Sequence, residues 1–327
     1  AHQHALQKKY RFSMEIVPYQ DWMLEQITQL FVEEYGFDYN NFKSEFEALY
    51  SHPFQKSKAF RVAAIDGDVV MGYTSFLYWP LRSSQDELLE AYQCGNVIVG
   101  KHHRGKGVFS AILKAINAGI EPFDYDVIIG FPVEASYHGF VRKGWSSPFK
   151  LNWHSKIANP ILSLFSLSRL TKENRDSLRC ENFDLSQFTG TETALTPAFQ
   201  SFRESILKGL YLIESIPSED DEIYFEIKYQ IRKRILVEAI IGKISKRSGK
   251  PFSEHDLKQI MRRSSQFMRA TFFSIAITEQ ASSDALNAVG FNQMKNRQIH
   301  FISKDGKRQF AEETKGISLG RADIDTW

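Results

Sequence analysis

Apolar positions in the first half of the chain recur with two spacings, which predict alternating strands and helices. Residues 149–154 alternate apolar and polar side chains, which is typical of an edge strand. Residues 21–35 repeat apolar positions at helical spacing and predict an amphipathic helix. Asp66-Gly67-Asp68 separates the apolar runs 60–65 and 69–78, which predicts a β-hairpin.

The most distinctive pattern is a short apolar run, 97–99, that leads into a glycine-rich turn and then a helix. Gly105 and Gly107 occupy the turn. After them, apolar residues return at helical spacing, namely Val108, Ile112, Leu113, Ile116 and Ile120. The first amides of a helix lack partners inside the helix and favour an anion. The pattern therefore predicts a phosphate-binding turn, although its spacing differs from the two commonest nucleotide motifs.

This turn and the elements around it resemble the GNAT acetyltransferases. His102-His103-Arg104-Gly105-Lys106-Gly107 is similar to their motif Arg/Gln-x-x-Gly-x-Gly/Ala, with His102 where the family has Arg or Gln. The elements that follow also have the GNAT order: a buried strand at 125–130, a short helix at 134–143 that ends at Gly144-Trp145, and the strand at 149–154. The resemblance covers residues 10–157. It implies an α/β GNAT fold with a mixed, mostly antiparallel sheet.

The second half repeats this order of elements. Val127 precedes Gly144, and Phe273 precedes Gly290, by the same 17 residues, so the halves can be interpreted as tandem copies about 146 residues apart. A common αβ unit that recurs by chance is the alternative. Between Asp184 and Ala270 there are helical patterns, at 196–209 and 253–267, but no glycine-rich turn that opens a helix. We therefore expect a degenerate GNAT-like second half without a nucleotide site. The expected domains are 1–158 and 183–327, joined by a linker at 159–182.

The resemblance implies an acetyl-CoA-dependent N-acetyltransferase in which a primary amine attacks the acetyl thioester directly. It implies that the backbone of the fourth GNAT strand binds the pantetheine arm and the oxyanion, and that the amides of the turn bind the pyrophosphate. Arg104 and Lys106 would add positive charge. The cofactor-binding residues so implied are Val97, Ile98, Val99, His102, His103, Arg104, Gly105, Lys106, Gly107 and Val108.

Proton transfer requires an acid for the leaving thiolate and a base for the attacking ammonium. The tyrosine that GNAT enzymes often use as the acid is replaced here by Phe140. Tyr137 lies one turn earlier on the same helical face beside His138, so either Tyr137 has taken this role or it is a packing residue. The usual base aligns with Ala91, next to Glu90, whose alternative is an exposed surface carboxylate. The predicted catalytic residues are Tyr137, Glu90 and His138, and a water-mediated base is a further alternative.

The tandem plan leaves the acceptor open. It resembles long acetyltransferases of bacterial polysaccharide and amino-sugar pathways, which suggests an amino sugar. Aminoacyl transferases that use the same plan are one alternative, and a non-catalytic acyl-CoA-binding or scaffold protein is another.

Composition excludes some classes of partner and cofactor. A net charge of +2 provides no broad field for nucleic acid, and no apolar run reaches the ~18 residues of a membrane span. Asp323 and Asp325 alone do not make a metal site, so no metal is expected. The two cysteines, Cys94 and Cys180, form no disulfide framework, which favours a reducing cytoplasm. The sequence leaves a homodimer open.

Overall fold

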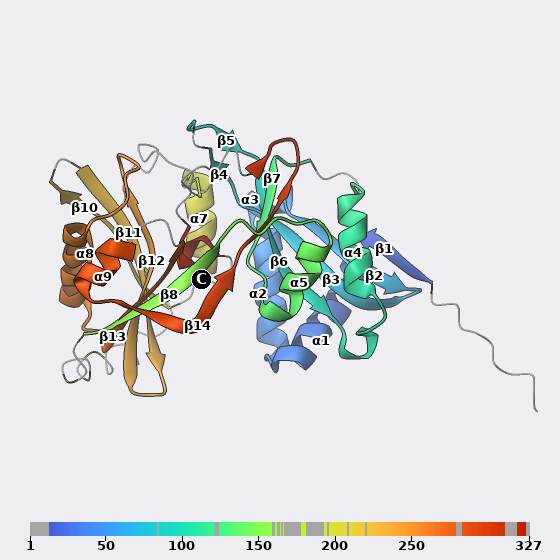
Figure 1. The fold of residues 1–327 in the computed structure, drawn as a ribbon. Coiled ribbons are helices and arrows are strands. Elements are labelled where there is room, and N and C mark those ends of the chain that lie inside the picture. The colour runs from blue at the N-terminus through green and yellow to red at the C-terminus, as the bar shows by residue number, and fades with distance from the viewer. Residues whose placement is uncertain are drawn as a thin grey trace, which may run out of the picture. The chain divides into compact units, whose positions relative to one another are not determined.

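The described part of the chain divides into two compact units. One contains the described residues within Ala1–Leu77 and Cys94–Phe123, and the other contains those within Tyr78–Gln93 and Asp124–Trp327. The structure, a computed structural model shown in Figure 1, describes residues 13–83, 85–120, 124–158, 161, 164, 166, 178–180 (backbone only), 193–194, 196–207, 209–219, 221–278, 283–310 and 319–324. The predicted linker at 159–182 lies mostly outside these residues, and the predicted domain boundaries stay a prediction.

The first unit is built on a sheet with helices on both faces. The strands β1 (Met14–Pro18), β2 (Phe60–Asp66), β3 (Val69–Tyr78) and β6 (Ala91–Val99) are neighbours in that order. Asp66 pairs with Val69 across the turn, which confirms the predicted hairpin. After β6 come a short 3-10 helix, η2 (Lys101–His103), and the helix α4 (Val108–Asn117).

The helices α1 and α2 build the core on one face of this sheet. α1 (Leu24–Tyr35) follows a 3-10 turn, η1 (Asp21–Met23), and confirms the predicted helix, while α2 (Tyr39–Ser51) is followed by α3 (Pro53–Lys56). The apolar side chains of α1 and α2 pack with those of β2, β3 and β6 in one buried cluster, which includes Met23, Ile27, Phe31, Phe46, Tyr50, Tyr73 and Ile98. α4 covers the opposite face, where it contacts β1 and β2.

The second unit contains a larger, mostly antiparallel sheet. Its strand order is β14-β8-β13-β12-β11-β10-β9, and β12–β13 and β10–β9 are its parallel pairs. The strands are β8 (Lys150–Ile157), β9 (Leu178–Cys180), β10 (Leu210–Ser218), β11 (Asp221–Arg232), β12 (Leu236–Lys246), β13 (Phe272–Thr278) and β14 (Asn292–His300). Two short strands, β4 (Leu81–Arg82) and β5 (Leu88–Leu89), pair separately.

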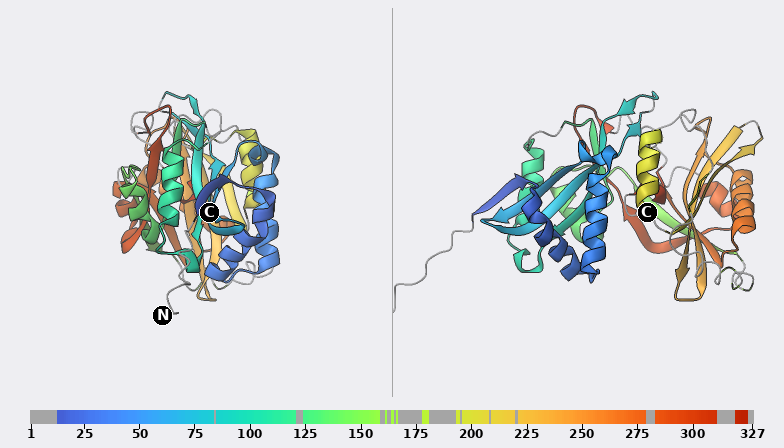
Figure 2. Two further views of the ribbon diagram at one scale, coloured as in Figure 1. Left: turned by 90° about the vertical axis from the view of Figure 1, so that its right-hand side faces the viewer. Right: turned by 180° about the vertical axis from the view of Figure 1, so that it is seen from behind.

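Helices cover both faces of this larger sheet, as Figure 2 shows from behind. α8 (Glu254–Phe267) and α9 (Ser283–Val289) share a buried apolar cluster with β10, β11, β12 and β13. On the other face, α7 (Pro197–Ile206) is joined to β11 by the pair Arg203–Glu226. α7 and α8 confirm the helical patterns that the sequence showed at 196–209 and 253–267.

The three strands β10, β11 and β12 were not predicted, because only helical patterns were found between residues 184 and 270. Buried glutamates interrupt their apolar alternation. Glu214, Glu226 and Glu238 are each at most 1% exposed and are paired internally with arginines. A carboxylate inside a core is stable only when it is paired, and such pairing is not visible in a hydrophobic pattern.

The prediction that residues 149–154 form an edge strand is wrong, because β8 lies between β13 and β14. Two of its polar residues are buried and hydrogen-bonded within the sheet. Asn152, 2% exposed, accepts a hydrogen bond from Gln298, and His154, 7% exposed, contacts the carbonyl of Asn152. The apolar and polar alternation of β8 is therefore a sheet-interior pattern with satisfied polar groups.

Two strands are exchanged between the halves of the sequence. β8 belongs to the first half but lies in the sheet of the second half, whereas β15 (Ile302–Asp305) pairs with β7 (Val127–Gly130) of the first half. The helix α5 (Glu134–Arg142) follows β7. The last strands of the two halves therefore interlock within the second unit.

Candidate functional site

The turn between β6 and α4 has an open helix start. Gly105 and Gly107 adopt left-handed conformations, with φ of 74° and 80°, which non-glycine residues rarely do. Gly107 is the N-cap of α4, and no side chain caps this helix. Apart from the adjoining backbone, a Cβ at Gly105 or Gly107 would meet no atom within 4 Å. The start of α4 thus has both the dipole and the room to bind an anion.

Two cations fasten this turn to α1. Arg104 forms an ion pair with Glu34 at 2.6 Å and donates to the Val99 carbonyl at 3.3 Å. Lys101 donates to the Glu33 carbonyl at 2.6 Å. Because Glu34 offsets the charge of Arg104, an anion at this turn would rely chiefly on backbone amides.

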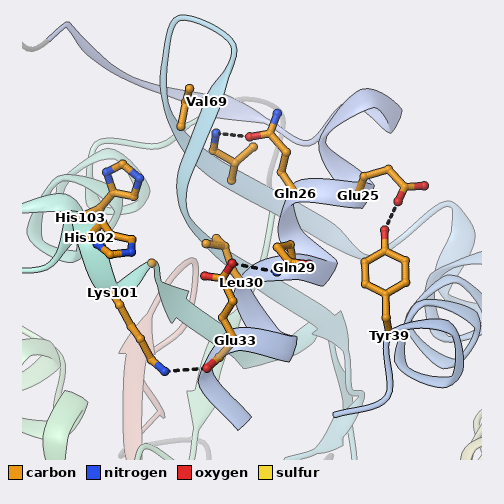
Figure 3. Close-up of a pocket in the computed structure, with 12 residues that line it drawn as sticks. Glu25, Gln26, Gln29, Leu30, Glu33, Tyr39, Val69, Lys101, His102 and His103 are labelled. Carbon is orange, nitrogen blue, oxygen red and sulfur yellow. Dashed lines mark hydrogen bonds between the residues drawn. The ribbon is translucent and has the colours of Figure 1, made fainter. Parts of the chain in front are cut away.

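A pocket of about 430 Å³ lies beside the turn, and α1, the start of β3 and residues 100–103 line it. Figure 3 shows His102 and His103 on one side and the polar side chains of α1 on the other. Gln26 accepts from the Val70 amide and donates to the Asp68 carbonyl, which holds the hairpin against α1. Burial, together with the nearby positive charge of Lys106 and His102, lowers the pKa of His103.

The remaining predicted cofactor residues lie directly before and after the turn. Val97, Ile98 and Val99 form the end of β6, where Ile98 is buried. Val108 is the first residue of α4 and is 1% exposed. The structure therefore brings all ten predicted cofactor residues together within the first unit.

The equivalent helix of the second half has a closed start. α8 begins at Glu254, the position that the tandem repeat aligns with Val108, where α4 begins. Ser253 and Asp256 form a reciprocal capping box, with Ser253 N donating to Asp256 at 2.7 Å and Asp256 N donating to Ser253 at 3.2 Å. Asp256 also accepts from Ser218 and, at 3.1 Å, from Lys246. The start of α8 is therefore capped by the protein's own side chains, with a buried carboxylate beside it.

Two of the predicted catalytic residues, Tyr137 and His138, lie together on α5. The Tyr137 ring stacks on the ring of His300, with centroids 4.1 Å apart, and its hydroxyl donates to Ser147 at 3.1 Å. Ser147 in turn donates to the Phe301 carbonyl at 2.9 Å.

Glu134 joins two histidines in this cluster. It contacts His300 at 2.5 Å and the exposed His138 at 3.4 Å. The hydrogen bond from His300 is the main cause that lowers the pKa of Glu134. Sequence reasoning missed His300, which lies in the other half of the sequence, and Ser147, which follows α5 in the same half. The sequence signal available for His300 was the repeat, in which this residue is the counterpart of His154.

The third predicted catalytic residue, Glu90, is exposed and lies directly before β6. Tyr78 donates to its carboxylate at 3.1 Å, and its own amide donates to Asp126 at 2.9 Å. Burial and the charge of Glu90 raise the pKa of Tyr78, so this hydroxyl remains a donor. Glu90, Tyr137 and His138 all belong to the second unit.

The described residues contain no cluster of three or more histidine, cysteine, aspartate or glutamate side chains that could hold a metal ion, and Asp325 lies outside them. In the same part of the chain, no helix is both long and apolar enough to cross a bilayer. Cys94 is buried. Trp79 is a core residue, because it is 1% exposed and its indole N–H donates to the Thr193 hydroxyl.

No protein-family model matches the sequence, and the curated proteins contain no match. Solved structures do resemble this chain over both halves. A GCN5-related N-acetyltransferase from Anabaena variabilis has a TM-score of 0.59 at 9% identity and matches 89% of this chain and 72% of its own. A candidate acetyltransferase from Pyrococcus horikoshii has a TM-score of 0.53 at 13% identity and matches 98% of both chains.

A third structure with this fold is a glucosamine N-acetyltransferase region of a fungal GH3 β-N-acetylglucosaminidase. Its TM-score is 0.51 at 12% identity, with 89% of this chain and 38% of that chain matched. These likenesses show the fold. The chain has an α/β GNAT fold with a second GNAT-like half, as the sequence predicted.

Proposed function

We propose that this protein is an acetyl-CoA-dependent N-acetyltransferase with one nucleotide site, at the turn between β6 and α4. In this proposal the pyrophosphate binds the amides of residues 103–108, and the pantetheine arm runs along Val97, Ile98 and Val99. His102 and Lys106 lie at the edge of the same turn.

The observation that carries the proposal is the difference between the two equivalent helix starts. α4 begins at a left-handed glycine with no side-chain cap, whereas α8 begins with a capping box and a buried carboxylate. The GNAT fold covers both helices, so the fold by itself does not distinguish them. The residues at the two helix starts distinguish them, because, of these two starts, only that of α4 leaves room for an anion.

The reaction needs three events. The amine loses a proton, the neutral amine attacks the thioester carbonyl, and the departing thiolate gains a proton. We assign the base to Glu90, which accepts a hydrogen bond from Tyr78. We assign the acid to Tyr137, whose hydroxyl is oriented by Ser147 and whose ring rests on His300. His138 lies beside Tyr137 and is joined through Glu134 to the same cluster.

We propose an amino sugar as the acceptor. The support is a likeness of fold to the fungal glucosamine N-acetyltransferase region. Turnover with glucosamine, compared with spermidine and with a peptide that has a free N-terminus, tests this assignment. Faster turnover of spermidine or of the peptide would make that class of amine the acceptor in place of an amino sugar.

Calorimetric titration with acetyl-CoA tests the site. Gly107→Glu puts a negative charge at the start of α4, and Gly119→Glu is the matched control at its far end. Both glycines are left-handed, with φ of 80° and 78°, and a Cβ meets nothing within 4 Å at either position. The backbone strain is therefore similar, and only the location of the charge differs.

We expect micromolar binding by the unmodified protein and by Gly119→Glu, and a loss of at least about tenfold in affinity for Gly107→Glu. Equal affinity of the two variants would refute the assigned cradle. Binding without turnover of any amine would favour a non-catalytic acyl-CoA-binding protein.

A further inference from the structure

The C-terminal segment 319–324 lies between two strands of the second unit. β12 and β13 pair only from Glu238–Phe272 to Ile241–Ile275, although both strands continue beyond this point. There, Gly320 forms a bridge with Ile277 of β13. A Cβ on Gly320 would stand 2.2 Å from the Gly242 carbonyl of β12. The segment thus fills the gap that opens where the two strands stop pairing.

Buried polar contacts hold this segment in place. Asp323 is 1% exposed, and its carboxylate accepts from Lys243 at 2.9 Å, from Thr193 at 2.7 Å and from the Gly320 amide at 2.8 Å. Arg203 donates to the Ala322 carbonyl at 3.1 Å. Lys243 and Asp323 are both at most 4% exposed, so their ion pair is buried.

The repeat identifies the strand that this segment contacts. When the second half is laid on the first, β6 (Ala91–Val99) corresponds to 237–245, which is almost the whole of β12. Asn96 has a left-handed φ of 49°, and its counterpart Gly242 is an extra residue between Ile241 and Lys243 in the pairing with β11. Both strands are therefore irregular at the same place. Lys243 is the counterpart of Val97.

We infer that β12 and β13 form a latent groove for a pantetheine-like amide chain, which residues 319–324 occupy as an internal ligand. The inference rests on the proposed function, which runs the pantetheine arm along Val97, Ile98 and Val99 of the first half. An extended peptide offers a strand the same amide donors and acceptors as pantetheine does. Together with Asp256 at the start of α8, the segment closes the second half to acyl-CoA.

Gly320→Ala tests this inference by steric exclusion. Gly320 has φ −124°, which alanine adopts without strain, so the variant changes only the close approach to Gly242. Asp323→Asn is a second variant that keeps the shape and removes the charge facing Lys243. Hydrogen exchange is measured by mass spectrometry for the peptides that contain 242–246 and 275–278, with and without millimolar pantetheine.

In the unmodified protein we expect pantetheine to leave this exchange unchanged. In Gly320→Ala we expect exchange to accelerate by about tenfold or more and pantetheine to slow it again. Asp323→Asn should show the same changes in direction, and it decides the question if Gly320→Ala does not fold. Unchanged exchange in the variants, or accelerated exchange that pantetheine does not slow, would overturn the inference.

Acetyl-CoA titration of the same proteins separates this inference from the proposed function. We expect one equivalent to bind the unmodified protein and both variants, because the cradle lies in the first unit. If no acetyl-CoA binds while the exchange results are as expected, the proposed function fails and the latent groove stands. If acetyl-CoA binds but the exchange results are not as expected, the latent groove fails and the proposed function stands.

Discussion

Gly144 and Gly290 end α5 and α9 with the same backbone conformation, with φ of 86° and 88°. After each glycine, the next amide donates back to the carbonyl five residues earlier: Trp145 to Phe140 at 3.2 Å, and Phe291 to Leu286 at 2.9 Å. The two donors are counterparts in the repeat, and so are the two acceptors. The tandem repeat therefore extends to individual backbone hydrogen bonds, and the two helix ends are copies of one C-cap.

Substitution of either glycine by alanine should reduce stability by a similar amount. An alanine in the left-handed conformation costs about 1–2 kcal/mol, whereas asparagine tolerates it better. We expect Gly144→Ala and Gly290→Ala each to lower the free energy of unfolding in urea by about 1 kcal/mol. The asparagine variants should lose less. An alanine variant as stable as the original protein would show that its helix end does not need this conformation.

The stability contributed by Asp256 should depend on pH. Burial alone would raise the pKa of this carboxyl, but the hydrogen bonds from Ser218, Ser253 and Lys246 outweigh burial and hold the pKa below its ordinary value. A carboxyl whose pKa is lowered by folding stabilises the protein above its unfolded pKa, and this contribution is lost as the pH falls through the folded pKa.

Asp256→Asn measures this contribution directly. The free energy of unfolding of the variant should fall below that of the original protein by about 1–2 kcal/mol near pH 6, and the difference should shrink toward pH 2. Glu254→Gln is the control, because Glu254 lies in the same helical turn but is solvent-exposed and paired with Lys258. A difference that stays constant with pH would contradict this role for Asp256.

The fold of the first half and the repeat could be predicted because their signals are local. The hairpin at Gly67, the glycine turn before α4 and the two helix ends each depend on a few neighbouring residues with fixed backbone requirements. A glycine after a helical pattern, or between two apolar runs, has one main structural explanation. The ten predicted cofactor residues all lie between Val97 and Val108, so one motif was enough to predict them together.

The exchanged strands and the buried ion pairs could not be predicted in this way. Nothing near His300 in sequence indicates that it stacks on Tyr137, which lies in the other half of the chain. Glu226 is unsuited to a sheet interior until Arg203, on another element, is placed beside it. These features depend on partners distant in sequence, and a pattern of apolar positions contains no information about partners.

Removal of one member of the pair Arg203–Glu226 should destabilise the protein strongly, whereas replacement of both members by apolar residues should destabilise it much less. Two hydrogen bonds of 2.8 and 2.7 Å join the side chains, and both residues are at most 6% exposed. Removal of one member leaves a buried charge without compensation, so Arg203→Met should destabilise the protein by about 3–5 kcal/mol. The double variant Arg203→Met with Glu226→Leu should recover much of this loss. Urea unfolding of the two single variants and the double variant measures the coupling, and additive losses would contradict it.

The variant Tyr137→Phe should show whether Tyr137 acts as a proton donor or as a packing residue. The substitution keeps the ring on His300 and removes only the hydroxyl that donates to Ser147. If this hydroxyl protonates the thiolate, kcat for the best amine should fall by about a hundredfold or more, with little change in the affinity for acetyl-CoA. Ser147→Ala is the matched control, because it removes the same hydrogen bond but leaves the tyrosine proton. It should retain kcat within a few-fold, whereas equal effects of the two variants would assign Tyr137 a structural role.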